Sequence, residues 1–450
     1  YGVSTAYAAK IYRQYQKDSI KTVKENPYQL ADDIWGIGFK TADSIASKMG
    51  YGNSDPRRCR SGILYTLNQL AEEGHVYAEP EQLVTAAKEL LQADEEPIRK
   101  AVADMIEAKD LIADNDVLYL PPFYHAENGS AKRLTTLLSE SFFSDMAAEE
   151  AVPYGSQPDN GIVYDEVQQA AIRQALESKV MVLTGGPGTG KTTTTQGIIA
   201  AFKSRGMQIL LAAPTGRAAK RMTEATGMEA KTIHRLLEYN PMDGYKRNDE
   251  NPLEGDALIV DECSMIDIML FYNLMKAIPS KMRLILVGDI DQLPSVGAGN
   301  VLRDIIDSQR IPVVRLTRIF RQAQTSRIVM NAHAINAGRF PNISNGKDTD
   351  FFFIKAEDAG AIPQLIVSLV RDRLSRAYSC NPKEIQVLTP MQRGNVGAGN
   401  LNTELQNALN PSGESLTRGG YTFRRGDKVM QIRNNYDKNV FNGDIGYVNA

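Results

Sequence analysis

The stretch GGPGTGKT, residues 185–192, constrains this chain more than any other. It follows the apolar run VMVLT directly, and a segment with helical spacing comes after it. Its glycines let consecutive backbone N–H groups curl around a phosphate at the positive end of the following helix. A strand before the loop and a helix after it are the context in which such a loop binds a nucleotide. The sequence therefore predicts a nucleotide-binding α/β domain.

The region from 162 to 310 has the pattern of a buried parallel sheet. The runs VMVLTG, ILLAAPT, ALIVDE and RLILVGD alternate with helical stretches. Continuous apolar strands separated by helices are typical of a sheet that is covered on both faces. A second set of such runs, PVVRLT, DFFFI and EIQVLTP, begins near Ile311 and predicts a second α/β domain over 311–450.

Composition limits the remaining possibilities. The chain has 450 residues, enough for about three domains, and a net charge of -3, so any nucleic-acid binding must use local patches. Its three cysteines are isolated, which favours a reducing cytoplasm and argues against a disulfide framework or a zinc site. No apolar run approaches the roughly 20 residues that span a bilayer. Because residue 1 is Tyr, we expect a piece of a longer protein.

The N-terminal part reads as helical. In NPYQLADDIWGIGFKTADSIASKMG, Gly36 and Gly38 interrupt two apolar-periodic segments, and their backbone N–H groups can face a phosphate. Residues 1–56 thus resemble a helix-hairpin-helix, a sequence-independent binder of the DNA backbone. The alternative is an ordinary helical hairpin with a glycine turn.

The other segments are read from their composition. The pattern of residues 57–146 predicts three helices and a two-stranded ribbon, which together suit a small winged-helix-like module. Residues 147–161 have the composition of a linker. The C-terminal stretch predicts short strands with an Asn-Gly turn at 442–443, the start of a small β-barrel insert from about 412.

Chemistry is expected where the strands of the first α/β domain end. Lys191 would reach the β- and γ-phosphates, and Thr192 would ligate Mg²⁺. Asp261 would hold the same Mg²⁺ through water, while Glu262 would act as general base toward the attacking water. Gln292 in VGDIDQLPSV lies beyond the next strand and would sense the γ-phosphate; otherwise it is a solvent-facing turn residue.

Six segments in fixed order carry a family resemblance. They are GGPGTGKT, APTGRAAKRM, KTIHRLL, LIVDECSM, GDIDQLPSVGAG and LTRIFRQ. The set resembles superfamily 1 (1B) DNA helicases of the RecD-like type, in the long standalone form with an N-terminal helix-hairpin-helix region. The resemblance implies helical DNA-binding modules and two RecA-like domains, of which the second is incomplete here. It also implies ATP and Mg²⁺ as cofactors, 5′-to-3′ unwinding, and roles in repair and recombination.

The resemblance assigns nucleotide contacts that the residues alone do not. Gln168 in YDEVQQAAI would recognise adenine, with Gln169 as the neighbouring alternative, and Arg321 in IFRQ would stabilise the transferring phosphoryl group. The remaining contacts with the nucleotide would come from the phosphate loop and the start of its helix: Gly185, Gly186, Pro187, Gly188, Thr189, Gly190, Lys191, Thr192 and Thr193.

It also assigns contacts with one DNA strand. These would be made by Thr215, Gly216, Arg217, Thr232 and His234 in the first α/β domain, and by Thr389, Pro390 and Arg393 in the second. His234 is equally explained as a packed residue that organises its loop. The segment at about 238–256 resembles the hairpin that splits the duplex.

One departure from the family pattern leaves other functions open. The later motifs of the second motor domain, a threonine-histidine-glutamine segment and a further arginine, do not occur before Ala450. We expect truncation at both ends rather than a non-working motor. The expected protein is monomeric and acts on single-stranded, duplex or forked DNA. An RNA helicase of the same superfamily and a non-motor, ATP-dependent DNA-binding switch remain the alternatives.

Overall fold

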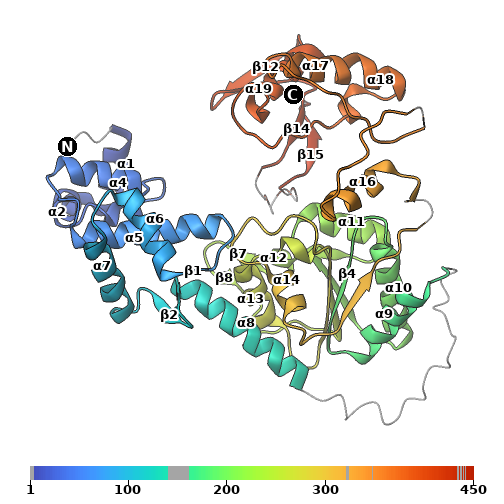
Figure 1. Cartoon of the computed structure of the whole chain (residues 1–450), viewed down its shortest axis with the longest axis horizontal. Coiled ribbons are helices and arrows are strands. Elements are labelled where there is room, and N and C mark those ends of the chain that lie inside the picture. The colour runs from blue at the N-terminus through green and yellow to red at the C-terminus, as the bar shows by residue number, and fades with distance from the viewer. Residues whose placement is uncertain are drawn as a thin grey trace. The chain divides into compact units, whose positions relative to one another are not determined.

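The computed structural model describes residues 5–139, 162–320, 324–346, 348–432, 435, 438, 440 and 442–449 (Figure 1). The chain divides into two compact units. The first comprises Tyr1–Gly186, Gly190–Pro214 and Met228–Thr317, and the second comprises Pro187–Thr189, Thr215–Gly227 and Arg318–Ala450. The expected linker at 147–161 and the expected catalytic residue Arg321 lie outside the described residues.

A six-stranded parallel sheet forms the centre of the first unit, in the order β11-β4-β10-β9-β5-β6. Its strands are β4 (Val180–Gly185), β5 (Ile209–Ala213), β6 (Ala230–Thr232), β9 (Ala257–Val260), β10 (Arg283–Gly288) and β11 (Val313–Leu316). All four residues of β9 and five of the six in β4 are buried, as continuous apolar runs predict for a sheet covered on both faces. The parallel sheet expected from the sequence is confirmed.

Helices cover both faces of this sheet. One face packs with α8 (Pro121–Ser139), α13 (Ile268–Ala277) and α14 (Val301–Asp307) into a single apolar cluster that includes Val182, Val260 and Leu286. Because side chains alternate along a strand, Met181 and Leu183 point to the opposite face. There α9 (Glu166–Glu177) and α10 (Lys191–Ser204) contact β4, and the two helices pack against each other. The sheet thus holds the carboxyl ends of its strands at one rigid edge.

The strand PVVRLT does not open a second α/β domain. It forms β11, which pairs in parallel with β4 and places Val313 opposite Val182. The domain boundary expected at Ile311 is therefore wrong. The sequence of a strand does not show which other strand it pairs with. The segments DFFFI and EIQVLTP lie within the described residues 348–432, and neither of them is a strand. No described neighbour pairs with them, and Phe352 and Leu388 are exposed.

The N-terminal hairpin consists of two short helices joined by a glycine turn. They are α3 (Gln29–Asp33) and α4 (Phe39–Lys48), and α1 (Thr5–Tyr15) and α2 (Ser19–Glu25) precede them. A small apolar cluster holds Ile11, Leu30, Ile34, Ile37 and Ile45. Ala42, also on α4, packs in a neighbouring apolar cluster instead.

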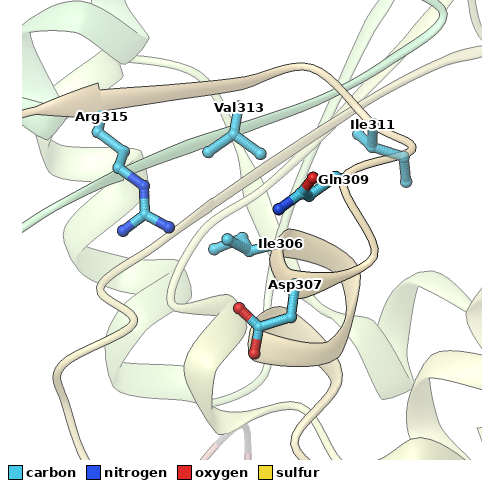
Figure 2. Close-up of a pocket in the computed structure, with 6 residues that line it drawn as sticks. All are labelled: Ile306, Asp307, Gln309, Ile311, Val313 and Arg315. Atoms are coloured by element: carbon cyan, nitrogen blue, oxygen red, sulfur yellow. The ribbon is translucent and has the colours of Figure 1, made fainter.

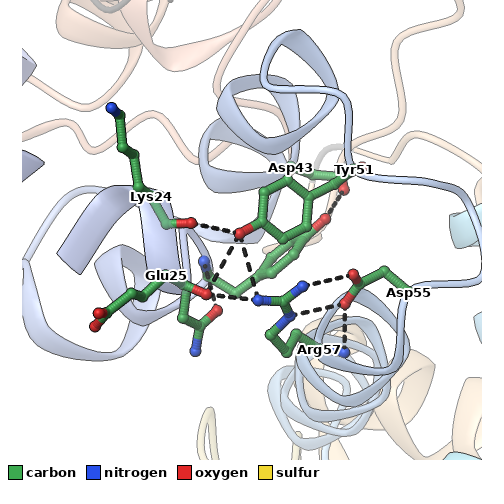
Figure 3. A network of polar contacts seen from close by, with 8 residues as sticks. Lys24, Glu25, Asp43, Tyr51, Asp55 and Arg57 are labelled. Carbon is green, nitrogen blue, oxygen red and sulfur yellow. Dashed lines mark hydrogen bonds and ion pairs between the residues drawn. The ribbon is translucent and has the colours of Figure 1, made fainter. Parts of the chain in front are cut away.

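A polar network ties the end of α2 to the start of α5 (Pro56–Glu72), as Figure 3 shows. Tyr51 donates its hydroxyl to the Lys24 carbonyl oxygen at 2.8 Å, and Arg57 lies over the Tyr51 ring at 4.6 Å. Arg57 also donates to the Glu25 carbonyl oxygen and pairs with Asp55, the N-cap of α5. These contacts fix the ends of the hairpin region against α5.

The following module has three helices and three short strands. The helices are α5, α6 (Pro80–Leu91) and α7 (Glu95–Glu107). The strands β1 (Tyr77–Ala78), β2 (Ile112–Asp114) and β3 (Val117–Tyr119) form a sheet in the order β1-β3-β2. The expected ribbon is thus extended by β1. Next, α8 packs along α13, where Gly129 lies against the Tyr272 ring.

In the second unit, helices precede small antiparallel sheets. The helices are α11 (Gly216–Thr226), α16 (Arg327–Asn336), α17 (Ile362–Ser368), α18 (Leu374–Ala377) and α19 (Ala398–Leu409). The strand β12 (Ser415–Arg418) pairs with β13 (Tyr421–Arg424), and β14 (Lys428–Met430) pairs with β15 (Ile445–Tyr447). The turn predicted at 442–443 precedes β15, and Gly443 has a φ of +93°.

Candidate functional site

The phosphate loop has the expected local geometry. It connects the end of β4 at Gly185 to the start of α10 at Lys191. Gly188 and Gly190 adopt φ angles of +74° and +86°, a left-handed conformation that side chains disfavour. This conformation lets successive backbone N–H groups turn toward one point at the N-terminus of α10. The loop is therefore shaped to hold a phosphate group.

Lys191 is held at the strand ends by oxygen atoms. Its ammonium group donates to the carbonyl oxygens of Gly185 and, at 3.2 Å, Gly186. It also lies 3.8 Å from the carboxylate of Asp289, which follows β10 and is 2% exposed. The same carboxylate accepts a hydrogen bond from Gln292 Nε2 at 3.4 Å. The structure thus brings the loop lysine and the expected sensor to one carboxylate.

Sequence reasoning missed Asp289 as a functional residue. It stands in the stretch VGDIDQLPSV, where the glycine and aspartate suggest an ordinary turn. The signal that could have found it is a charged residue directly after a fully apolar strand, because a strand end in a parallel sheet is where ligands bind. An ordinary turn residue would be exposed, whereas Asp289 is buried next to Lys191.

The expected acidic pair follows β9 at the same edge of the sheet. The register places Val260 opposite Leu286 of β10, and Gly288 opposite Thr184 of β4, so Asp261 and Glu262 follow a strand that is separated from β4 by β10 alone. Glu262 has a φ of +53°, which is strained for a residue with a side chain. The Asp261 carboxylate accepts a hydrogen bond from the Glu262 N–H at 2.8 Å, which supports this turn.

Cys263, next to this pair, is not suited to chemistry. It is buried, its thiol donates to the Val260 carbonyl oxygen at 3.1 Å, and burial raises its pKa well above the ordinary value. A thiol held neutral is a poor nucleophile and a poor metal ligand. Within the described parts of the chain, no group of three or more His, Cys, Asp or Glu residues could hold a metal ion by itself.

Gln168 occupies a buried position at the start of α9. Its side-chain oxygen accepts from the Asp165 N–H at 3.0 Å, and its own N–H donates to the Asp165 carboxylate at 2.9 Å. This capping box satisfies the oxygen, but within the described part of the chain Gln168 Nε2 has no hydrogen-bond partner, although the side chain is 1% exposed. An unpaired buried amide is costly, and the acceptor nitrogens of an adenine ring could satisfy it. Gln169 instead donates to the Tyr164 carbonyl oxygen at 2.9 Å.

Two expected DNA contacts in the first unit have structural tasks of their own. Thr232 caps α12 (Ile233–Leu236), and its hydroxyl accepts from the Arg235 N–H at 3.1 Å. The His234 ring packs at 5.6 Å and 6.0 Å from Tyr239 and Tyr245. These tyrosines belong to β7 (Tyr239–Asn240) and β8 (Gly244–Tyr245), a hairpin within the segment at 238–256. The geometry of His234 favours the packing explanation.

The remaining expected contacts lie in separate places. In the second unit, Thr215 caps α11 by accepting from the Ala218 N–H at 3.2 Å, and Arg217 is exposed on that helix. Thr389 donates its hydroxyl to the Val396 carbonyl oxygen at 2.6 Å, while Pro390 and Arg393 are exposed. In the N-terminal hairpin, Gly36 has a φ of +86°, and Gly38 precedes α4 without a side-chain cap.

A hollow of about 580 Å³ in the first unit has no part in this arrangement (Figure 2). It lies between the end of α14 and β11, and Asp307, Gln309 and Arg315 supply its polar groups. None of the residues expected to bind nucleotide or DNA lines it.

A parallel sheet whose strand ends gather a phosphate loop, an acidic pair and a buried aspartate defines the class of P-loop nucleotide-binding proteins. Family models match three parts of this chain. An "ATP-dependent RecD2 DNA helicase HHH domain" matches residues 1–77, an "AAA domain" matches 168–298, and an "ATP-dependent RecD-like DNA helicase SH3 domain" matches 401–450.

Named relatives agree with these matches. The chain is 33% identical to the ATP-dependent RecD2 DNA helicase of Deinococcus radiodurans, over 99% of this chain and 62% of that protein. It is 31% identical to the RecBCD enzyme subunit RecD of Mycobacterium tuberculosis, over 75% of this chain and 63% of that protein. The chain therefore belongs to the RecD2-type helicase family, and it spans less than two thirds of these relatives' length.

A solved structure of the Pif1 helicase from Candida albicans is also similar, at 21% identity over 64% of this chain and 69% of that chain. The two structures superpose with a TM-score of 0.34. Among the described residues, no helix is long and apolar enough to cross a membrane.

Proposed function

We propose that this chain hydrolyses ATP and couples the hydrolysis to movement along single-stranded DNA and to duplex unwinding. The observation that carries the proposal is the connection from Lys191 in the phosphate loop, through buried Asp289, to Gln292. A simple nucleotide-binding site needs only the loop. A buried carboxylate that also engages the next strand-end loop offers a way to report the state of the nucleotide elsewhere.

Each residue at this edge then has a chemical task. The N–H groups of the loop and Lys191 bind the β- and γ-phosphates, and Gln168 Nε2 hydrogen-bonds the adenine ring. Thr192 and Asp261 would hold Mg²⁺, which would neutralise phosphate charge. Glu262 accepts a proton from water as the water oxygen bonds to the γ-phosphorus and the bond to the bridging oxygen breaks.

Gln292 links hydrolysis to movement in this proposal. Its amide bonds the γ-phosphate or the attacking water, and it exchanges that contact for Asp289 once the phosphate leaves. Arg321, in a segment outside the described residues, would complete the site and stabilise charge on the transferring group. The DNA strand would contact Thr215, Gly216, Arg217, Thr232, Thr389, Pro390 and Arg393.

The duplex would meet other parts of the chain. Gly36 and Gly38 would hold the DNA backbone through their N–H groups. The β7–β8 hairpin would separate the strands, and the 93% exposed side chain of Met242 lies in its turn.

The test is steady-state ATP turnover with and without single-stranded DNA. We expect strong stimulation by DNA, and its loss in Lys191→Ala, in which the phosphate-binding ammonium is absent. Lys203→Ala, at an exposed position of the same helix, is the matched control and should retain turnover. Stimulation by RNA alone would instead favour an RNA helicase. Turnover that neither nucleic acid stimulates would overturn the motor proposal in favour of an ATP-dependent switch.

A further inference from the structure

The turn of the N-terminal hairpin presents an exposed tryptophan. Trp35 is the single tryptophan of the chain, and 87% of its surface is accessible. Its neighbours in the turn, Ile34 and Ile37, are 7% and 2% exposed and anchor the hairpin in its apolar cluster. The Ile37 N–H also donates to the Ile34 carbonyl oxygen at 3.0 Å, which closes the turn. The indole ring thus projects from a fixed platform.

A positive charge lies beside this ring. The Lys10 ammonium is 5.8 Å from the centroid of the Trp35 ring and donates to the Trp35 carbonyl oxygen at 3.2 Å. Gly36 leaves room for it, since a Cβ atom there would lie 2.8 Å from Lys10 Nζ. Lys40, in the first turn of α4, instead lies 5.9 Å from the centroid of the Tyr65 ring. An aromatic ring beside a cation is a combination that binds nucleic acid, because the ring stacks on a base while the cation attracts phosphates.

Two carboxylates also lie close to the turn, at Asp32 and Asp33. Asp33 accepts hydrogen bonds from the Tyr15 hydroxyl at 2.8 Å and from Gln29 at 3.1 Å, so its charge is engaged within the hairpin. Burial raises the pKa of Asp32. Hydrogen bonds within the hairpin, and not a basic partner, therefore occupy the Asp33 carboxylate.

We propose that Trp35 stacks on the exposed face of a nucleobase next to the phosphates that the hairpin holds. Bases inside a continuous duplex present no free face, so the ligand is an unpaired base or the terminal base of a duplex. The inference rests on the proposed DNA binding by this region and adds a preference for open bases. Contacts of Gly36 and Gly38 with the DNA backbone alone would not distinguish unpaired bases from paired ones.

Fluorescence of the single tryptophan provides the test, with DNA binding followed separately by the anisotropy of labelled DNA. Three DNAs are compared: a single strand, a blunt duplex and a closed circular duplex without ends. We expect the first to quench the indole emission and the third to leave it unchanged. Quenching by the blunt duplex would identify the terminal base pair as an additional source of the base face.

Substitutions separate stacking from general binding. Trp35→Ala should weaken single-strand binding about 5- to 150-fold, the range that loss of one stacked base implies. Trp35→Phe, which retains a ring, should recover most of that loss. Tyr12→Ala removes a 60% exposed aromatic side chain of α1 and should have no effect.

Other results would overturn the proposal. Unchanged indole emission while anisotropy reports saturated binding would remove Trp35 from the interface but leave the DNA-binding function intact. Equal quenching by the closed circle would mean that the ring contacts the duplex surface instead of an open base. Absence of any anisotropy change would count against the DNA-binding function itself.

Discussion

The ammonium group of Lys191 lies 3.8 Å from the carboxylate of Asp289, which is almost fully buried. Burying a carboxylate costs free energy unless it is paired and hydrogen-bonded. Asp289 meets that cost through Lys191, the Asp291 N–H at 3.1 Å and Gln292 Nε2 at 3.4 Å. The same side chain therefore positions the group proposed to bind phosphate and the group proposed to sense it.

Replacing Asp289 with asparagine should lower kcat for ATP far more than it weakens ATP binding. The asparagine side chain is close in size, but it carries no charge to attract the Lys191 ammonium group. One carboxylate oxygen is also replaced by an NH2 group, which cannot accept the hydrogen bond from Gln292 Nε2. A misplacement of about 1 Å in a catalytic group costs roughly 100-fold in rate, which sets the expected size of the loss. Turnover and nucleotide affinity are measured on the same preparation.

Asp291→Asn is the control for this change, because it removes an exposed carboxylate two residues away. Wild-type turnover in that variant shows that the loss at Asp289 is not a general effect of charge. If Asp289→Asn turned over ATP normally, Asp289 would have no positioning role.

Gln292→Ala should bind ATP as the wild type does yet unwind less DNA per ATP consumed. Its amide is the group proposed to exchange Asp289 for the γ-phosphate, so its loss breaks the link rather than the binding site. The measurement is the number of base pairs opened per ATP hydrolysed. Leu293→Ala, at a neighbouring 85% exposed position, is the control. An unchanged ratio in Gln292→Ala would refute the sensor role.

The sequence was informative where one segment determines its own structure. The apolar runs between residues 162 and 310 predicted parallel strands, and the glycines predicted the turn before α10, because both depend on local burial or backbone freedom. Pairing between distant segments was not readable. Val313 belongs to the first sheet only because it lies opposite Val182. The role of Asp289 was hidden for the same reason, since it depends on Lys191, almost a hundred residues earlier.

Gly129→Ala should destabilise the first unit by about 1–3 kcal/mol, as overpacking typically does. Replacing glycine with alanine inside a helix is normally favourable by roughly 0.5–1 kcal/mol, so the sign is diagnostic. Here the added Cβ would lie 2.2 Å from a ring carbon of Tyr272 on α13. Denaturant unfolding measures the change in the free energy of unfolding.

Gly399→Ala provides the matched comparison for Gly129. It lies at the start of α19, where the nearest atom to an added Cβ is 3.6 Å away, and it should be neutral or slightly stabilising. Shortening the opposing side chain in Gly129→Ala/Tyr272→Leu should recover part of the loss. A Gly129→Ala variant as stable as the wild type would mean that α8 does not pack tightly on α13.

His234 should make the wild-type protein less stable as the pH falls below about 6.5. Burial among Tyr239, Tyr245 and their surroundings lowers the pKa of His234 from its ordinary value of 6.5, and nearby Asp267 opposes this only in part. The unfolded chain then binds a proton that the folded protein does not, so the free energy of unfolding decreases as the pH is lowered.

In His234→Phe this titration is absent while the ring packing remains. Other titrating groups are common to both proteins. The difference in Tm, variant minus wild type, should therefore increase as the pH is lowered from 7.5 to 5.5. Parallel Tm curves would mean that His234 is solvated, and its assignment as a packed residue would give way to the DNA-contact role.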